Sequence, residues 1–172
     1  AESAYAWLAA GRFSVPALNP NPLIEEWLAG ARLVTLFKLE TMQSVLVDLV
    51  QRPGLERSAA VQIGQAIVSL NPNPLRDSLA QSLSIKGVAG ELRNNVIGNL
   101  VGDEDRTAMT ETLSLVMSIA DSTDQLQLAT GLASSKTGLE ALIDCVERGR
   151  ASATLLRNAA IANKVVAIAD AK

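Results

Sequence analysis

Histidine is absent from the sequence, and cysteine occurs once, as Cys145. Without histidine the chain cannot use Ser-His-Asp or Cys-His catalysis, bind zinc through histidine or attach a c-type haem. A single cysteine can form neither an internal disulfide nor a thiolate metal cluster. We therefore expect a protein that is not an enzyme and that holds no metal or cofactor.

Clusters of positive charge and long apolar runs are also lacking. The formal net charge is −3, and the 15 lysines and arginines are scattered singly along the chain. Nucleic-acid binding usually needs a basic surface, and recognition of single strands needs aromatic side chains for stacking. A membrane-spanning helix needs about 20 mostly apolar residues, whereas charges interrupt the long apolar stretches here. We expect neither nucleic-acid binding nor insertion into a membrane.

Helical periodicity dominates the pattern that is present. Apolar residues recur at spacings of three and four, and the alternation typical of strands does not compete with them. Proline and glycine separate the periodic segments, most clearly in the Asn-Pro-Asn-Pro-Leu segments at residues 19–23 and 71–75. One helix is predicted to end near Arg32 and the next to run from Val34 to Gln51. The sequence therefore predicts an all-α fold of roughly eight to ten short helices.

Capping residues mark several of the predicted helix starts. An oxygen-bearing side chain at the N-cap accepts hydrogen bonds from backbone amides that have no partner within the helix. The predicted N-cap residues are Asp103, Ser122, Thr137 and Ser152. Gln125 and Glu140 lie three residues after two of them, which is the spacing of a capping box. The helix after Ser152 is predicted to extend to about Ala169.

The sequence repeats short segments at related distances. The matching pairs are residues 46–52 with 142–148, residues 11–14 with 149–152, and residues 19–23 with 71–75. Their offsets are 96, 138 and 52 residues, near two, three and one multiples of a period of about 46–48 residues. Such a period is typical of HEAT and armadillo repeats, so we predict a right-handed α-solenoid of stacked helix pairs. The alternative is a non-repetitive helical bundle in which these matches arise by chance.

One segment resembles a known family. Residues 138–156 read GLEALIDCVERGRASATLL, which is similar to the HEAT-like helical stretch of large secreted proteins of planctomycetes and related bacteria. In that family the stretch lies between a sugar-dehydrogenase-like propeller and a c-type cytochrome domain. The resemblance implies a scaffold segment of a longer polypeptide with a periplasmic or extracellular location. Because no haem-attachment motif is present, it implies no haem function for this chain.

The aromatic residues are confined to one end of the chain. All five lie within the first 37 residues, whereas the rest of the chain depends on leucine, alanine, valine and isoleucine for its core. We predict a single helical-repeat domain over residues 1–172, with a cap or junction at 1–40 and repeats at 41–172. Trp7 and Trp27 are expected to be buried against the first repeat or against a neighbouring domain.

Two other features have competing interpretations. Cys145 replaces an apolar residue of the repeated segment and has no histidine to activate it, so core packing is favoured over a reactive thiol. Asn94, Asn95 and Asn99 interrupt an apolar helix. They can form the solvent face of that helix or a ladder on the inner surface of a solenoid, and we favour the solvent face.

These patterns favour a scaffold over an enzyme. We expect a non-catalytic helical-repeat scaffold or protein–protein interaction module, whose partner is another protein or a flanking domain of the same polypeptide. One alternative is a helical bundle that binds a small apolar ligand in a long internal cavity. The other is a carboxylate-dependent enzyme subunit, which would need Asp48, Asp144 and Glu147 to converge in one apolar pocket. The sequence identifies no binding residues.

Overall fold

The computed structural model describes residues 21–102 and 105–170. Within these ranges every regular element is helical, which confirms the predicted all-α fold. The elements are α2 (Asn21–Phe37), η1 (Glu40–Met42), α3 (Gln43–Val50), α4 (Arg57–Leu70), α5 (Pro74–Ser82), α6 (Glu91–Val101), α7 (Arg106–Ile119), α8 (Ser122–Leu132), α9 (Lys136–Glu147), η2 (Ala153–Arg157) and α10 (Ala159–Asp170). Here η marks a 3₁₀ helix.

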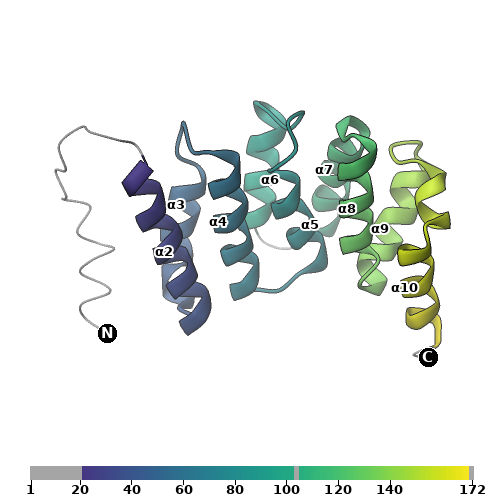
Figure 1. The fold of residues 1–172 in the computed structure, drawn as a ribbon, viewed down its shortest axis with the longest axis horizontal. Coiled ribbons are helices and arrows are strands. Elements are labelled where there is room, and N and C mark those ends of the chain that lie inside the picture. The colour runs from purple at the N-terminus through teal and green to yellow at the C-terminus, as the bar shows by residue number, and fades with distance from the viewer. Residues whose placement is uncertain (1–20, 103–104, 171–172) are drawn as a thin grey trace.

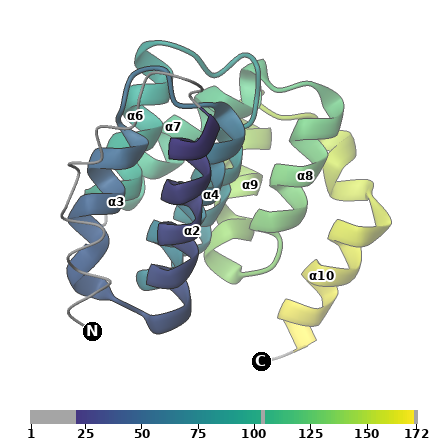
Figure 2. The same ribbon diagram turned by 60° about the vertical axis from the view of Figure 1, so that its left-hand side comes forward.

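The helices are arranged in two layers. In the first layer α2 packs on α4, α4 on α5, α5 on α8, and α8 on α10. Helices α3, α6, α7 and α9 form the second layer. They pack on the helices of the first layer: α3 on α4, both α6 and α7 on α5, and α9 on α8. The chain advances from α2 at one end of the array to α10 at the other (Figures 1 and 2). Most helices therefore contact neighbours that are close in the sequence.

The core between the two layers is aliphatic. Among the described residues no aromatic side chain is fully buried, and small residues let the helices approach one another. A Cβ added at Gly64 of α4 would lie 3.3 Å from the Cβ of Ala80 on α5. The largest fully buried side chains are Leu46, Ile63, Ile67, Leu75, Leu79, Leu83, Leu100, Met109, Leu113, Met117, Leu128 and Leu132.

The second Asn-Pro-Asn-Pro-Leu segment starts α5, as predicted. Asn73 accepts a hydrogen bond from the backbone amide of Leu75 at 3.0 Å, and Pro74 takes the first helical position, where a missing N–H group costs nothing. Leu75 and Leu79 then enter the core. Helix α5 contacts α4, α6, α7, α8 and α9, so this cap orients the central helix of the molecule.

The predicted break near Arg32 is wrong. Helix α2 continues to Phe37 because Ala31 and Val34 both face the core, at 2% and 1% exposure, and keep the helical register. The chain turns at Lys38, whose φ is 48°. The amides of Lys38 and Leu39 bond back to the carbonyls of Thr35 and Val34, which is the Schellman pattern with a lysine in place of the usual glycine.

The predicted capping boxes are also wrong in position. The N-cap residues found in the structure are Asp105 for α7, Asp121 for α8 and Ser135 for α9. Asp121 and Ser135 take the places of the predicted caps Ser122 and Thr137. The predicted cap Asp103 lies outside the described residues. Asp121 accepts hydrogen bonds from two backbone amides at 2.9 Å. A carboxylate at this position is a stronger acceptor than a serine hydroxyl and is favoured by the helix dipole.

The last predicted helix is divided in two. Ser152 is an N-cap, as predicted, but it caps the short η2 helix, in which it accepts from the amide of Thr154. Asn158 then adopts an extended backbone and accepts from the amide of Ala160 at 2.9 Å. The side chain of Asn158 therefore starts α10 separately from η2.

The two longest repeated segments occupy similar places. Residues 46–52 end α3 and residues 142–148 end α9, and both helices belong to the second layer. Leu46 and its counterpart Leu142 are buried, as are Leu49 and its counterpart Cys145.

Candidate functional site

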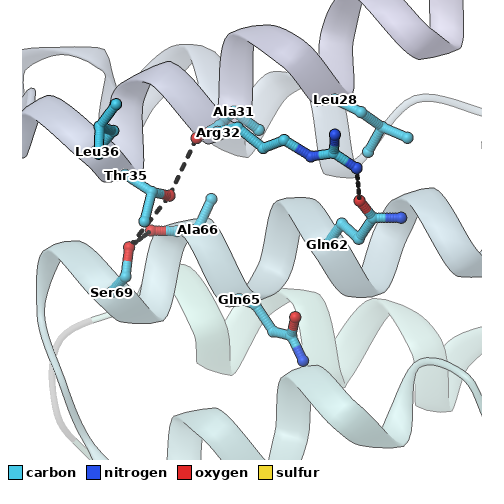
Figure 3. Close-up of a pocket in the computed structure, with 9 residues that line it drawn as sticks. All are labelled: Leu28, Ala31, Arg32, Thr35, Leu36, Gln62, Gln65, Ala66 and Ser69. Carbon is cyan, nitrogen blue, oxygen red and sulfur yellow. Dashed lines mark hydrogen bonds between the residues drawn. The ribbon is translucent and has the colours of Figure 1, made fainter.

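A surface groove lies between α2 and α4 (Figure 3). It has a volume of about 530 Å³ and is lined by Leu28, Ala31, Arg32, Thr35, Leu36, Gln62, Gln65, Ala66 and Ser69. Ala31 and Ala66 are almost fully buried, at 2% and 4% exposure, so the surface between the two helices is formed by small side chains. The volume is within the usual range for ligand-binding pockets.

The hydroxyl groups of the groove are turned back onto their own helices. Thr35 Oγ1 donates to the carbonyl of Ala31 at 3.0 Å, and Ser69 Oγ donates to the carbonyl of Ala66 at 2.7 Å. The two hydroxyl oxygens lie 3.4 Å apart across the groove. Because these groups are already engaged, the amides and the guanidinium are the polar groups most available to a ligand.

Arg32 is the one charged residue among the described residues that line the groove. Its Nη2 donates to Oε1 of Gln62 at 3.3 Å, and Figure 3 shows this bond crossing from α2 to α4. Among the described residues Arg32 makes no ion pair. The guanidinium is therefore held at the groove by a neutral amide, and no carboxylate of the described residues compensates its charge.

Three apolar side chains are exposed in the last two turns of α2, and one of them lines the groove. Leu36 is 73% exposed and Phe37 is 64% exposed, and Leu33 on the same helix is 45% exposed. Leu36 itself lines the groove. Exposed apolar groups that adjoin a groove mark sites of interaction more often than scattered ones do.

A second, smaller groove lies between α7 and α9. Its volume is about 250 Å³, and its lining includes Arg106, Glu140, Asp144 and Arg148. Arg106 forms an ion pair with Glu140, and Arg148 Nε lies 2.9 Å from Asp144 Oδ1. The four charges thus compensate one another in pairs, in contrast to the single arginine of the α2–α4 groove.

The three acids considered for catalysis do not converge. Asp48 and Glu147 are exposed, and Asp144 is half-buried beside Arg148. Asp48 lies on α3 and the other two on α9, near opposite ends of the second layer (Figure 1). No group of three or more His, Cys, Asp or Glu residues that could hold a metal ion is found within residues 21–102 and 105–170.

Cys145 lies fully buried in the core. Burial raises the pKa of its thiol from 9.0 to about 11, and a hydrogen bond with Ser114 opposes this shift. The thiol is therefore protonated at neutral pH, a state in which it packs as a small apolar group and is a poor nucleophile.

The asparagines of α6 lie outside both grooves. Asn94 and Asn95 are exposed, as the solvent-face interpretation predicts. Asn99 Nδ2 donates to Thr112 Oγ1 at 2.9 Å and so links α6 to α7.

Of the two tryptophans, Trp27 is half-buried, with the guanidinium of Arg52 4.8 Å from its ring centre. Trp7 lies outside the described residues.

Sequence reasoning missed the α2–α4 groove. The signal for it is a polar stripe on α4, where Gln62, Gln65 and Ser69 recur at helical spacing. Arg32 and Thr35 provide a matching polar stripe on α2. From the sequence alone, a stripe of this kind cannot be distinguished from the ordinary solvent-exposed face of a helix.

Comparison with known proteins found no match for this chain among protein-family models, curated sequences or solved structures. The resemblance of residues 138–156 to a planctomycete repeat segment therefore stays a prediction.

No helix in the part of the chain that the structure describes is long and apolar enough to cross a membrane, which agrees with the expected lack of membrane insertion.

Proposed function

We propose that this chain is a non-catalytic scaffold that binds another protein and that its helices form a HEAT-like α-solenoid. The observation that carries the proposal is the two-layer array, in which most helices pack on neighbours in the sequence and α5 also reaches α8 and α9. In a repeat protein each helix pair buries its apolar face against the adjacent pairs, and the array grows in one direction.

The repeated segments support the solenoid part of the proposal. The segment that ends α3 and the segment that ends α9 lie in the same layer, and each buries two equivalent side chains, Leu46 and Leu49 in one and Leu142 and Cys145 in the other. The offset of 96 residues between the segments corresponds to two repeats of about 48 residues.

The surface of α2 and α4 supports the binding part of the proposal. The groove between these helices is continuous with exposed Leu36, and Phe37 follows directly in the chain. A small apolar ligand is better enclosed by a deep cavity, whereas an open groove with an apolar margin suits a protein surface. The acids that a carboxylate enzyme would need are distributed over two distant helices.

Site-specific photo-crosslinking in the producing cells tests the proposal. A photoreactive residue is placed at Gln65, in the groove, or at Ser118, an exposed position on α7. We expect position 65 to form an adduct with a discrete protein and position 118 to form none. If no protein adduct forms at either position, and native mass spectrometry shows a bound small molecule instead, the binding role is wrong.

A further inference from the structure

We infer that the α2–α4 groove binds an extended peptide segment in which a carboxylate side chain is flanked by apolar side chains. The inference rests on the proposed role in protein binding and names the chemistry of the partner. It is argued from the charge, the dimensions and the lining of the groove.

The charge of the groove calls for a carboxylate. Arg32 lines the groove, and its one side-chain hydrogen bond within residues 21–102 and 105–170 is to the neutral amide of Gln62. A guanidinium has five N–H donors in a planar fork that fits a carboxylate with two parallel bonds. A carboxylate of the partner would therefore replace a long bond to a neutral group by a charge-assisted pair.

The acids of α2 are not placed to take that role. Glu25 and Glu26 precede Arg32 on α2 by seven and six residues, which is about 9–11 Å along the helix axis. Neither lines the groove. In the α7–α9 groove, by contrast, Arg106 and Arg148 already have carboxylate partners, so that groove offers no comparable charge.

The dimensions fit an extended chain. On α2 the lining runs from Leu28 to Leu36, and this distance is about 12 Å at the rise of an α-helix. An extended peptide covers that length with about four residues. The amides of Gln62 and Gln65 can both donate and accept, as the main chain of an extended peptide requires.

The remaining lining accepts apolar side chains. Leu28 and Leu36 lie on either side of Arg32 along α2, each four residues from it. Ala31 and Ala66 leave space between the helices. Successive side chains of an extended peptide point to opposite faces, and those two residues apart share a face at a spacing of about 6–7 Å. Leu28 and Leu36 are each about 6 Å from Arg32 along the helix axis. A carboxylate at Arg32 thus places the side chains two residues before and after it against Leu28 and Leu36.

Two peptides that differ in one charge test the inference. Both are acetylated and amidated; one has the sequence Leu-Ser-Glu-Ser-Leu, and lysine replaces the glutamate in the other. Binding to the full chain is followed by nitrogen–proton NMR spectra up to millimolar peptide. We expect the acidic peptide to shift amides of residues 28–36 and 62–69 and to bind about fivefold more tightly than the lysine peptide.

The variant R32E should reverse this preference. R157E is the matched control because Arg157 is also exposed but lies on η2, far from the groove. It should keep the preference for the acidic peptide. Absence of shifts in the groove, or an unchanged preference in R32E, would overturn the inference. The photo-crosslinking result stands apart, because a protein adduct elsewhere on the array would support binding without supporting this peptide chemistry.

Discussion

At the scale of single residues, the glycines of the helices differ sharply in the space around them. A Cβ added at Gly138, in the first turn of α9, would lie 2.2 Å from the carbonyl oxygen of Leu132. Gly98 is exposed within α6, and a Cβ there meets nothing within 4 Å. The first glycine is required by close contact between backbone segments, and the second is not.

The pair G138A and G98A tests this distinction. We expect G138A to lower the free energy of unfolding by about 1–3 kcal/mol because the backbone has to move. G98A should raise it by about 0.5–1 kcal/mol because alanine favours the helix. Urea denaturation followed by circular dichroism measures both. Equal effects of the two substitutions would show that the contact at Leu132 is wrong.

The buried thiol of Cys145 predicts a specific pH dependence. The unfolded chain loses the thiol proton near pH 9.0, whereas burial raises the pKa in the folded chain to about 11. The folded state is therefore disfavoured as the pH rises from 9 to 11, and stability falls by up to about 1.4 kcal/mol per pH unit from this group. Below pH 9 the thiol contributes no such slope.

Other groups also titrate at high pH, so C145A is the reference for this measurement. The free energy of unfolding of the original chain should fall more steeply between pH 9 and pH 11 than that of C145A. Parallel curves for the two proteins would contradict the burial of the thiol.

At the scale of helices, periodicity predicted most of the elements but not their ends. The apolar stripe of α5 and its start at Asn73 follow directly from the sequence. The end of α2 does not, because Lys38 adopts a left-handed conformation that sequence reasoning assigns to glycine. The division between η2 and α10 depends on the side chain of Asn158, and apolar periodicity alone does not predict it.

The cap of α8 can be tested directly. Asp121 accepts from two backbone amides, whereas the predicted cap, Ser122, is the first residue within the helix. D121A should cost about 1 kcal/mol of stability. S122A, at the adjacent exposed position, should change stability by less than about 0.5 kcal/mol. The opposite order would restore the predicted capping box.

The candidate groove could not be predicted because it requires two elements to be placed together. Gln62 and Arg32 are 30 residues apart in the sequence and meet because α2 and α4 pack side by side. The absence of histidine excludes several kinds of catalytic and metal site from the sequence alone. It does not show which helices pack against each other. Prediction of a binding site therefore depended on tertiary packing.

At the scale of the whole molecule, the proposed solenoid predicts that stability is local. Helix α10 packs on η2 and α8, whereas α3 and α4 lie toward the other end of the layers (Figure 1). In a repeat array a defect at one end is felt mainly by adjacent units. In a closed bundle the same defect destabilises all helices together.

Native-state hydrogen exchange on the variant I161A tests this claim most directly. Ile161 of α10 is fully buried, and its truncation to alanine removes about 2–5 kcal/mol of packing. A solenoid should show faster amide exchange in α8, η2 and α10, with unchanged exchange in α3 and α4. Acceleration of α3 and α4 by the same factor as α10 would contradict the solenoid and favour a cooperative bundle.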